Sequence, residues 1–148
     1  MTVAIIDYGS GNLRSAAKAF EYVGKARVAV TSDPDVVAYA DHVVLPGVGA
    51  FGNAMQSLNR LGIIDEIRLF AKSGKTLLGL CLGMQLLMKK SSEFGEHKGL
   101  NLIDGKIEHM KKYTKKNEKV KFPHIGWNTI NINENFIKDK MFEGLSKK

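Results

Sequence analysis

Residues 76–85, TLLGLCLGMQ, run from a predicted buried strand, Thr76–Leu80, into a predicted helix, Leu82–Lys89. Glycines stand two residues before and two residues after Cys81, the single cysteine of the chain. This spacing lets the backbone make a tight, strained turn that exposes the side chain between the glycines. A lone cysteine is more often a buried, inert residue. Here the elbow favours a nucleophile whose thiolate is stabilised by the helix dipole.

A similar strand-then-helix pattern recurs before this elbow. Short apolar runs predict strands at Thr2–Ile6, Arg27–Thr31 and His42–Leu45. Helical spacing and a first-turn proline predict helices at Leu13–Gly24, from Pro34, and at Asn53–Lys72 with an interruption near Gly62. Such alternation is typical of parallel βαβ units. We therefore expect an α/β fold: a flavodoxin-like open, mostly parallel sheet with helices on both faces and ligands outside the carboxyl ends of its strands.

The second half of the chain has a different character. Segments Ile103–Met110 and Ile125–Ile132 resemble strands, and we expect an antiparallel ribbon that brackets a lysine-rich stretch. The lysines are Lys106, Lys111, Lys112, Lys115, Lys116, Lys119 and Lys121. A solvated hairpin or edge segment is the simpler interpretation, and contact with a phosphorylated ligand or an acidic partner is the alternative. With Tyr113 as the one aromatic among them, they make a poor base-stacking platform, so no nucleic-acid partner is expected.

Composition limits the class of protein. The chain has 148 residues, of which 44% are hydrophobic and 25% charged, which fits one globular domain, predicted to span 1–148. No apolar run approaches the ~18 residues of a membrane span, and the N-terminus lacks the basic region of a signal peptide. One cysteine cannot form an internal disulfide, and with four histidines it makes no metal-ligand pattern. We expect a cytoplasmic protein with no membrane partner, no metal and no cofactor.

Two further loops have glycine-rich patterns. Residues 46–51, PGVGAF, follow a predicted strand. The glycines around Val48 permit its N–H to turn toward a developing oxyanion, together with the N–H of Leu82, although such a loop alone is more often a plain turn. Residues 7–12, DYGSGN, could cradle phosphate at a helix start. Their G-x-G is followed by Asn-Leu-Arg rather than by x-x-Gly, so a nucleotide site is not expected.

Taken together, these segments resemble the class I, or triad-type, glutamine amidotransferases, and most closely the glutaminase subunits of imidazole glycerol phosphate synthase in histidine biosynthesis. The resemblance rests on DYGSGN at 7–12, PGVGAF at 46–51, GLCLGMQ at 79–85 and KFPHIGWN at 121–128. The G-x-C-x-G-x-Q pattern alone indicates the class, whereas the first and last segments indicate the subunit. The resemblance extends from Met1 to Lys148.

The resemblance implies a mechanism. Cys81 would attack the side-chain amide of glutamine, a glutamyl thioester would form, and ammonia would leave before water releases glutamate. The N–H groups of Val48 and Leu82 would stabilise the oxyanion. The residues implied to hold the glutamine are Gly47, Gly49 and Gln85.

The resemblance also implies a partner. Ammonia would pass to a (β/α)8 barrel cyclase subunit, which uses it to make imidazole glycerol phosphate and an aminoimidazole carboxamide ribotide. The two subunits would form a heterodimer, in which the partner switches the glutaminase on. Asn12, Trp127 and Asn128 would face this partner. An exposed Trp127 fits an interface anchor, and a core tryptophan fits the sequence equally well.

One part of the family pattern is absent. The family's base and its orienting acid come as His-x-Glu, but x-Glu follows none of the histidines here, which are His42, His97, His109 and His124. We therefore expect a domain that is incomplete at its carboxyl end and inactive by itself, since general-base help is commonly worth about 10²–10⁴ in rate. The alternatives are a non-catalytic docking fragment, a paralogous subunit that feeds another acceptor enzyme, and a cysteine peptidase or redox protein on a similar scaffold.

Overall fold

The computed structural model describes residues 1–24, 26–114 and 126–129. The chain divides into two compact units, Met1–Tyr113 and Thr114–Lys148. All helices and strands described below belong to the first unit. Within the described ranges, no helix is both long enough and apolar enough to cross a membrane.

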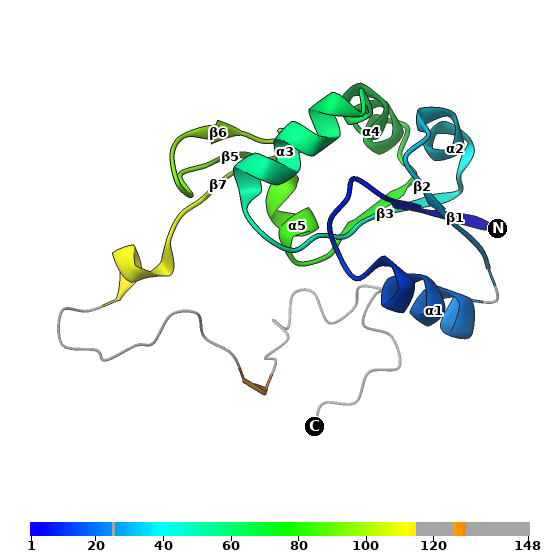
Figure 1. The fold of residues 1–148 in the computed structure, drawn as a ribbon, viewed down its shortest axis with the longest axis horizontal. Helices are drawn as coiled ribbons and strands as arrows, with labels where there is room; N and C mark the ends of the chain where they lie inside the picture. Colours follow the sequence, from blue (N-terminus) through cyan, green and yellow to red (C-terminus); the bar gives the residue numbers. More distant parts are fainter. Residues whose placement is uncertain (25, 115–125, 130–148) are drawn as a thin grey trace. The chain divides into compact units, whose positions relative to one another are not determined.

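A parallel sheet of four strands forms the centre of the first unit (Figure 1). Its strands are β1 (Thr2–Ile6), β2 (Arg27–Thr31), β3 (His42–Leu45) and β4 (Thr76–Gly79), in the order β2-β1-β3-β4. Every position of β1 and β3 after the first is buried. This burial explains why both strands are continuous apolar runs rather than alternating ones. The predicted parallel sheet is confirmed.

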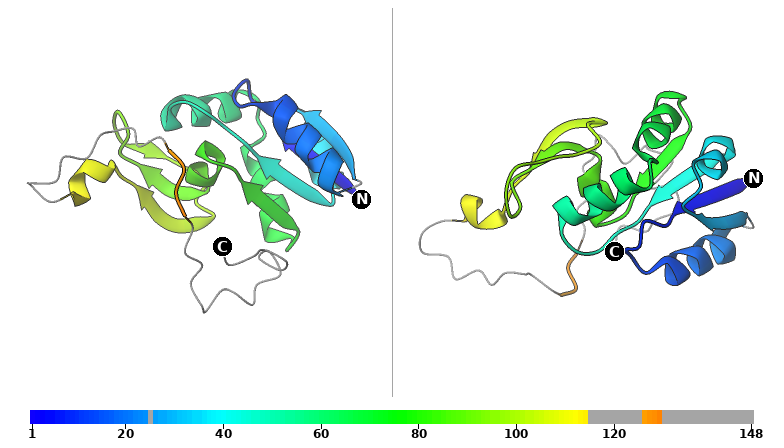
Figure 2. Two further views of the ribbon diagram at one scale, coloured as in Figure 1. Left: turned by 90° about the horizontal axis from the view of Figure 1, so that it is seen from below. Right: turned by 45° about the horizontal axis from the view of Figure 1, so that its top comes forward.

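Alternate residues of β1 pack on opposite faces of the sheet. Val3 and Ile5 belong to the apolar cluster that includes α1 (Leu13–Gly24), whereas Ala4 and Ile6 belong to the cluster on the other face. That other face is covered by α2 (Pro34–Tyr39), α3 (Phe51–Arg60), α4 (Ile64–Lys72) and α5 (Leu82–Leu86). In Figure 2 (right), the blue helix α1 lies below the sheet and the green helix α4 lies above it. The prediction of helices on both faces is confirmed.

Helix α5 is shorter than the predicted Leu82–Lys89, because Met88–Ser91 form strand β5 instead. The carbonyl oxygen of Leu87 accepts the N–H groups of Leu102 and Ile103 at 2.9 and 3.0 Å. A continuing helix would need this carbonyl for its own hydrogen-bond ladder. Because the returning chain takes it, the helix ends.

Strand β5 is the centre of a second sheet with the order β6-β5-β7. Strand β6 (His97–Lys98) is antiparallel to β5, and β7 (Ile103–Ile107) is parallel to it. This sheet is therefore mixed, where the sequence predicts an antiparallel ribbon. The strand predicted at Ile103–Met110 ends early and leads into a 3-10 helix at Met110–Tyr113. Most of the strand predicted at Ile125–Ile132 lies outside the described residues.

Candidate active site

Cys81 occupies the tight turn between β4 and α5. Its backbone has φ 55° and ψ −114°, a combination that L-residues rarely adopt, and its side chain is exposed. Both flanking positions require glycine, because neighbouring atoms leave no room for a Cβ. A Cβ on Gly79 would lie 2.6 Å from the Met84 Cα, and one on Gly83 would lie 1.7 Å from the Leu45 carbonyl oxygen. The predicted elbow is therefore present, with a strained and exposed cysteine at its tip.

The start of α5 places polar groups next to Cys81. The Leu82 N–H is the first of the helix, so it has no partner inside the helix. The Gln85 N–H donates to the Cys81 carbonyl oxygen at 3.3 Å, and the half-buried Gln85 follows the cysteine by one helical turn. Helix α5 has five residues. The dipole that favours a thiolate therefore comes from a shorter helix than the sequence predicts.

The glycine-rich loops after β1, β3 and β4 meet at the carboxyl ends of these strands. The Leu80 N–H donates to the Leu45 carbonyl oxygen at 3.0 Å, which holds the elbow against the end of β3. Gly11 lies against Gly47, since a Cβ on Gly11 would be 3.5 Å from the Gly47 nitrogen. Three segments that are far apart in the sequence therefore form one site.

Tyr8 anchors the PGVG loop (residues 46–49) from the side of β1. Its hydroxyl donates to the Pro46 carbonyl oxygen at 2.8 Å. It also fills the space beside Gly47, where a Cβ would lie 2.0 Å from the Tyr8 oxygen. Burial raises the pKa of the Tyr8 hydroxyl, so at neutral pH it stays protonated and keeps donating.

Ser10 holds the peptide group that the sequence assigns to the oxyanion. The Val48 N–H donates to Ser10 Oγ at 3.3 Å, and the Ser10 hydroxyl donates back to the Val48 carbonyl oxygen. The next residue, Gly49, has φ 100°, a conformation that glycine adopts without strain. In this conformation the Val48 N–H is already bonded. The role of the Val48 N–H in stabilising an oxyanion stays a prediction. In that role, its hydrogen bond to Ser10 Oγ would have to break.

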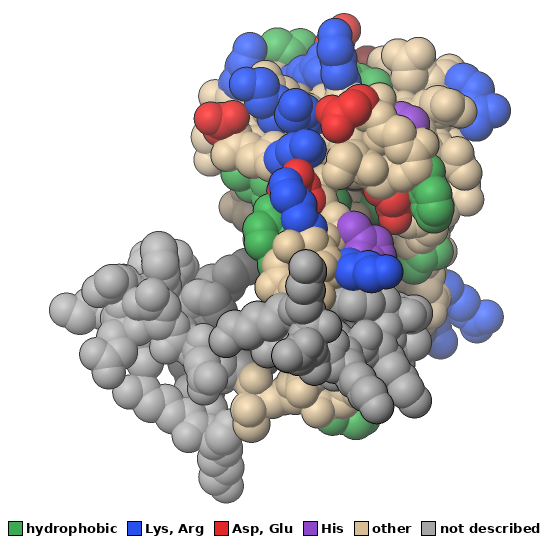
Figure 3. All heavy atoms as spheres, turned by 90° about the vertical axis from the view of Figure 1, so that its left-hand side faces the viewer, with side chains coloured by type: hydrophobic (Ala, Val, Ile, Leu, Met, Phe, Trp, Pro, Cys, Tyr) green, Lys and Arg blue, Asp and Glu red, His purple; other side chains and the backbone are tan. Residues whose placement is uncertain are grey.

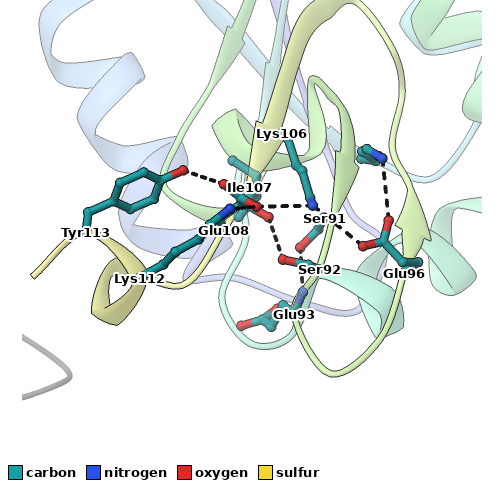
Figure 4. Close-up of polar contacts among 10 residues, drawn as sticks. Ser91, Ser92, Glu93, Glu96, Lys106, Ile107, Glu108, Lys112 and Tyr113 are labelled. Carbon is teal, nitrogen blue, oxygen red and sulfur yellow. Dashed lines mark hydrogen bonds and ion pairs between the residues drawn. The ribbon is translucent and has the colours of Figure 1, made fainter.

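Glu93 is a functional candidate that the sequence analysis does not identify. Helix α3 begins after Ala50, which has no capping side chain, and the Glu93 carboxylate accepts the Phe51 N–H at 2.7 Å instead. Glu93 is positioned in turn by the buried Ser91, whose Oγ accepts the Glu93 N–H at 3.1 Å (Figure 4). Because α3 follows the PGVG loop closely, Glu93 fixes the far end of that loop. The sequence signal is the missing N-cap, since such a helix needs an acceptor from elsewhere.

Two lysines of the lysine-rich stretch, Lys106 and Lys112, are ion-paired. The Glu108 carboxylate lies 2.8 Å from Lys112 Nζ and 3.1 Å from Lys106 Nζ, and it accepts a hydrogen bond from the Tyr113 hydroxyl (Figure 4). These hydrogen bonds, that of Lys112 foremost, lower the pKa of Glu108 to about 2. In Figure 3, acidic side chains lie among the basic ones. This pattern fits a solvated edge segment. The residues that lie outside the described part are Lys115, Lys116, Lys119 and Lys121.

The predicted partner-facing residues are exposed. Asn12 caps α1, because its side-chain oxygen accepts the Ser15 N–H at 3.2 Å. Trp127 and Asn128 belong to the second unit and are exposed there. The exposure of Trp127, 103%, fits an anchor better than a core residue.

His42 and His97 do not form a nucleophile–base pair with Cys81. His42 begins β3 opposite Thr76, at the other end of the strands from the elbow. The His97 ring packs on α3, where a Cβ on Gly52 would lie 2.6 Å from His97 Cε1. His124, the fourth histidine of the chain, lies outside the described residues.

Sequence comparisons find relatives over most of the chain. The family profile described as CobB/CobQ-like glutamine amidotransferase domain matches residues 2–136. The imidazole glycerol phosphate synthase subunit HisH of Syntrophotalea carbinolica is 50% identical over 131 residues, covering 88% of this chain and 63% of that protein. The HisH of Chlorobium luteolum is 44% identical over 144 residues, covering 97% and 67%. HisH 1 of Legionella pneumophila (strain Lens) is 48% identical over 129 residues, covering 87% and 60%.

Solved structures share the fold at low sequence identity. A crystal structure of a glutamine amidotransferase has a TM-score of 0.58 at 22% identity, covering 70% of this chain and 54% of that chain. A putative peptidase E protein from Listeria monocytogenes EGD-e has a TM-score of 0.57 at 19% identity, covering 70% and 63%. The chain spans 60% of the length of the Legionella relative.

Proposed function

We propose that this chain, which belongs to the CobB/CobQ-like family of class I glutamine amidotransferases, carries the nucleophile and the oxyanion-binding loop of a site that hydrolyses glutamine. The observation that carries the proposal is the exposed Cys81, at φ 55° on an elbow that packs against the PGVG loop. A positive φ at a non-glycine residue stores strain that the surrounding contacts must maintain. Here those contacts present a sulfur beside the first N–H of a helix.

The proposed reaction begins with the Cys81 thiolate. The sulfur adds to the side-chain amide carbon of glutamine, and the carbonyl oxygen becomes an oxyanion that accepts hydrogen bonds from the Leu82 and Val48 N–H groups. The intermediate then collapses, the C–N bond breaks, and the nitrogen takes up a proton and leaves as ammonia. Water attacks the resulting thioester, the C–S bond breaks, and glutamate leaves while the thiol is restored.

The substrate would be held beside these groups. We assign Gly47, Gly49 and Gln85 to glutamine binding, because the two glycines flank Val48 and Gln85 follows Cys81 by one turn of α5. At Gly49 nothing lies within 4 Å of the position of a Cβ, which leaves room for a ligand to approach the backbone closely. In this assignment, substrate binding draws the Val48 N–H away from Ser10 and toward the oxyanion.

The proposed acceptor of the ammonia is a (β/α)8 barrel cyclase subunit in a heterodimer. Identities of 44–50% to proteins named as HisH subunits of imidazole glycerol phosphate synthase support this setting in histidine biosynthesis. The exposed Asn12, Trp127 and Asn128 are the proposed docking residues. Tryptophan is one of the side chains enriched among the residues that contribute most of the binding energy of an interface.

The test is glutamate release from glutamine, measured with the chain alone and with a barrel cyclase subunit present. Cys81→Ala is the control, because it removes the sulfur and leaves the glycines of the elbow in place. Because the His-x-Glu pattern that would supply a base is absent and general-base help is commonly worth about 10²–10⁴ in rate, we expect little or no release by the chain alone. With the partner present, we expect release that depends on Cys81. Equal release by Cys81→Ala and the unsubstituted chain would contradict the proposal, as would no release in the presence of the partner.

A further inference from the structure

A hollow separate from the elbow opens at the carboxyl edge of the sheet, on the side of β2. Its volume is about 350 Å³. Asp7 and Ser32 line it directly after β1 and β2, and Ser57 and Arg60 line it from α3. The hollow therefore lies outside the carboxyl ends of β1 and β2. None of these side chains has a part in the proposed glutamine chemistry.

The hollow contains two opposite charges that are not paired with each other. Among the described residues, the ion pairs include neither Asp7 nor Arg60. Asp7 Oδ1 accepts the Gly9 N–H at 2.9 Å, and one Arg60 nitrogen donates to Ser57 Oγ at 3.3 Å. Within the part of the chain that the structure describes, the second Asp7 carboxylate oxygen and the remaining Arg60 N–H groups have no hydrogen-bond partner, so a ligand could use them. A simple anion would be attracted by Arg60 but repelled by Asp7. A simple cation would be attracted by Asp7 but repelled by Arg60.

We propose that this hollow binds a free α-amino acid as a zwitterion. The guanidinium of Arg60 pairs with the ligand carboxylate, which suits its planar fork of donors. The Asp7 carboxylate accepts the ligand ammonium, and the hydroxyls of Ser32 and Ser57 supply further polar groups. The volume is at the lower end of the range for small-molecule pockets, which suits a ligand of this size.

This second site lies close to the PGVG loop. Tyr8 is one wall of the hollow, and the same Tyr8 hydroxyl donates to the Pro46 carbonyl oxygen at 2.8 Å. The hollow is therefore one hydrogen bond from the loop that carries Val48. It is nevertheless distinct from the elbow, since neither Cys81 nor Gln85 lines it.

The test is a saturation-transfer NMR titration of the full chain with L-alanine. N-acetyl-L-alanine lacks the ammonium charge and L-alanine methyl ester lacks the carboxylate, so each probes one of the two proposed pairs. Arg60→Gln and Asp7→Asn remove the charges on the protein. Arg14→Gln, at an exposed position of α1 on the other face, is the matched control. Circular dichroism melts confirm that each variant is folded.

We expect saturable L-alanine binding that is about tenfold or more weaker in Arg60→Gln and in Asp7→Asn, since each loses a charge-assisted pair. Arg14→Gln and Cys81→Ala should bind as the unsubstituted chain does, which separates this site from the glutamine site. The absence of saturable binding would overturn the proposal. So would equal binding of either singly charged analogue, or binding that is lost in Cys81→Ala and kept in Arg60→Gln.

Discussion

At the residue scale, Gly83 is the position of the elbow with the least room for a side chain, because it packs against the end of β3. A Cβ on Gly83 would lie 1.7 Å from the Leu45 carbonyl oxygen, so Gly83→Ala must push α5 away from the sheet. Overpacking of this kind typically costs about 1–3 kcal/mol. We expect the free energy of unfolding, measured by urea denaturation, to fall by about 1 kcal/mol or more.

Gly24→Ala is the matched control for this prediction. A Cβ there would meet the Ala26 Cβ at 3.6 Å, an ordinary contact. Surface changes of this kind stay within about 0.5 kcal/mol. Equal free energies of unfolding for the two variants would show that the elbow does not depend on the missing side chain.

Ser10 is the second residue with a testable role. Its hydroxyl exchanges hydrogen bonds with both the N–H and the carbonyl of Val48. Ser10→Ala frees this N–H for an oxyanion, and a net hydrogen bond is worth about 1 kcal/mol, or about fivefold in rate. We expect Cys81 to react several-fold faster with 6-diazo-5-oxo-L-norleucine, a glutamine analogue with a diazoketone in place of the amide. Ser10→Thr, which keeps the hydroxyl, should react at the original rate. A slower Ser10→Ala would mean that Ser10 holds Val48 in its working position.

Local spacing explains which site residues the sequence can predict. Cys81 stands out because its glycines are two positions away, and the structure places it on the predicted elbow. Ser10 and Glu93 do not stand out, because their contacts reach Val48 and Phe51 across 38 and 42 residues of chain. No local pattern encodes contacts between residues so far apart in the sequence.

At the element scale, the start of α3 depends on Glu93. Its carboxylate accepts the Phe51 N–H at 2.7 Å where Ala50 offers no cap. We expect Glu93→Ala to lower the free energy of unfolding by about 0.5–2 kcal/mol, the usual cost of a lost helix cap, and to speed hydrogen exchange of the Phe51 amide. Glu21→Ala, at an exposed position of α1, is the control. Unchanged exchange of the Phe51 amide in Glu93→Ala would contradict this role.

The contacts of Glu108, which directly follows β7, predict that the free energy of unfolding depends on pH. The pKa of Glu108 is lowered from 4.5 to about 2, chiefly by its hydrogen bond with Lys112. The folded pKa lies below the unfolded one, so the stabilisation is present above pH 4.5 and is lost as the pH falls toward 2. We expect an NMR titration of the Glu108 carboxyl with a midpoint near 2. In Glu108→Gln, unfolding should lose part of its pH dependence in this window. A midpoint near 4.5 would show that these contacts do not persist in solution.

Apolar patterns predict the strands of the parallel sheet better than they predict the second sheet. β1, β2 and β3 have the predicted bounds, because each is a short apolar run that ends at turn-forming residues. Met88 and Lys89 instead belong to the helix predicted at Leu82–Lys89, but in the structure they begin β5. Their strand conformation is decided by the chain that returns to Leu87 from Leu102 and Ile103. Nothing local in the sequence records that return.

At the scale of the whole molecule, the loops that form the candidate site all follow strands of the parallel sheet and lie at the carboxyl ends of those strands. Loops after β1, β3 and β4 bring Tyr8, Val48 and Cys81 together within the first unit. The proposed docking residues Trp127 and Asn128 belong to the second unit. The central claim, that Cys81 is the nucleophile of a glutamine site, therefore concerns the first unit and can be tested without a partner.

The most direct measurement is the rate at which 6-diazo-5-oxo-L-norleucine alkylates Cys81, followed by intact-mass spectrometry. Because the chain has one cysteine, the modified thiol is identified without ambiguity. The account predicts labelling that glutamine slows and that the chain unfolded in urea does not show. Labelling that glutamine leaves unchanged, or that proceeds as fast in the unfolded chain, would contradict it.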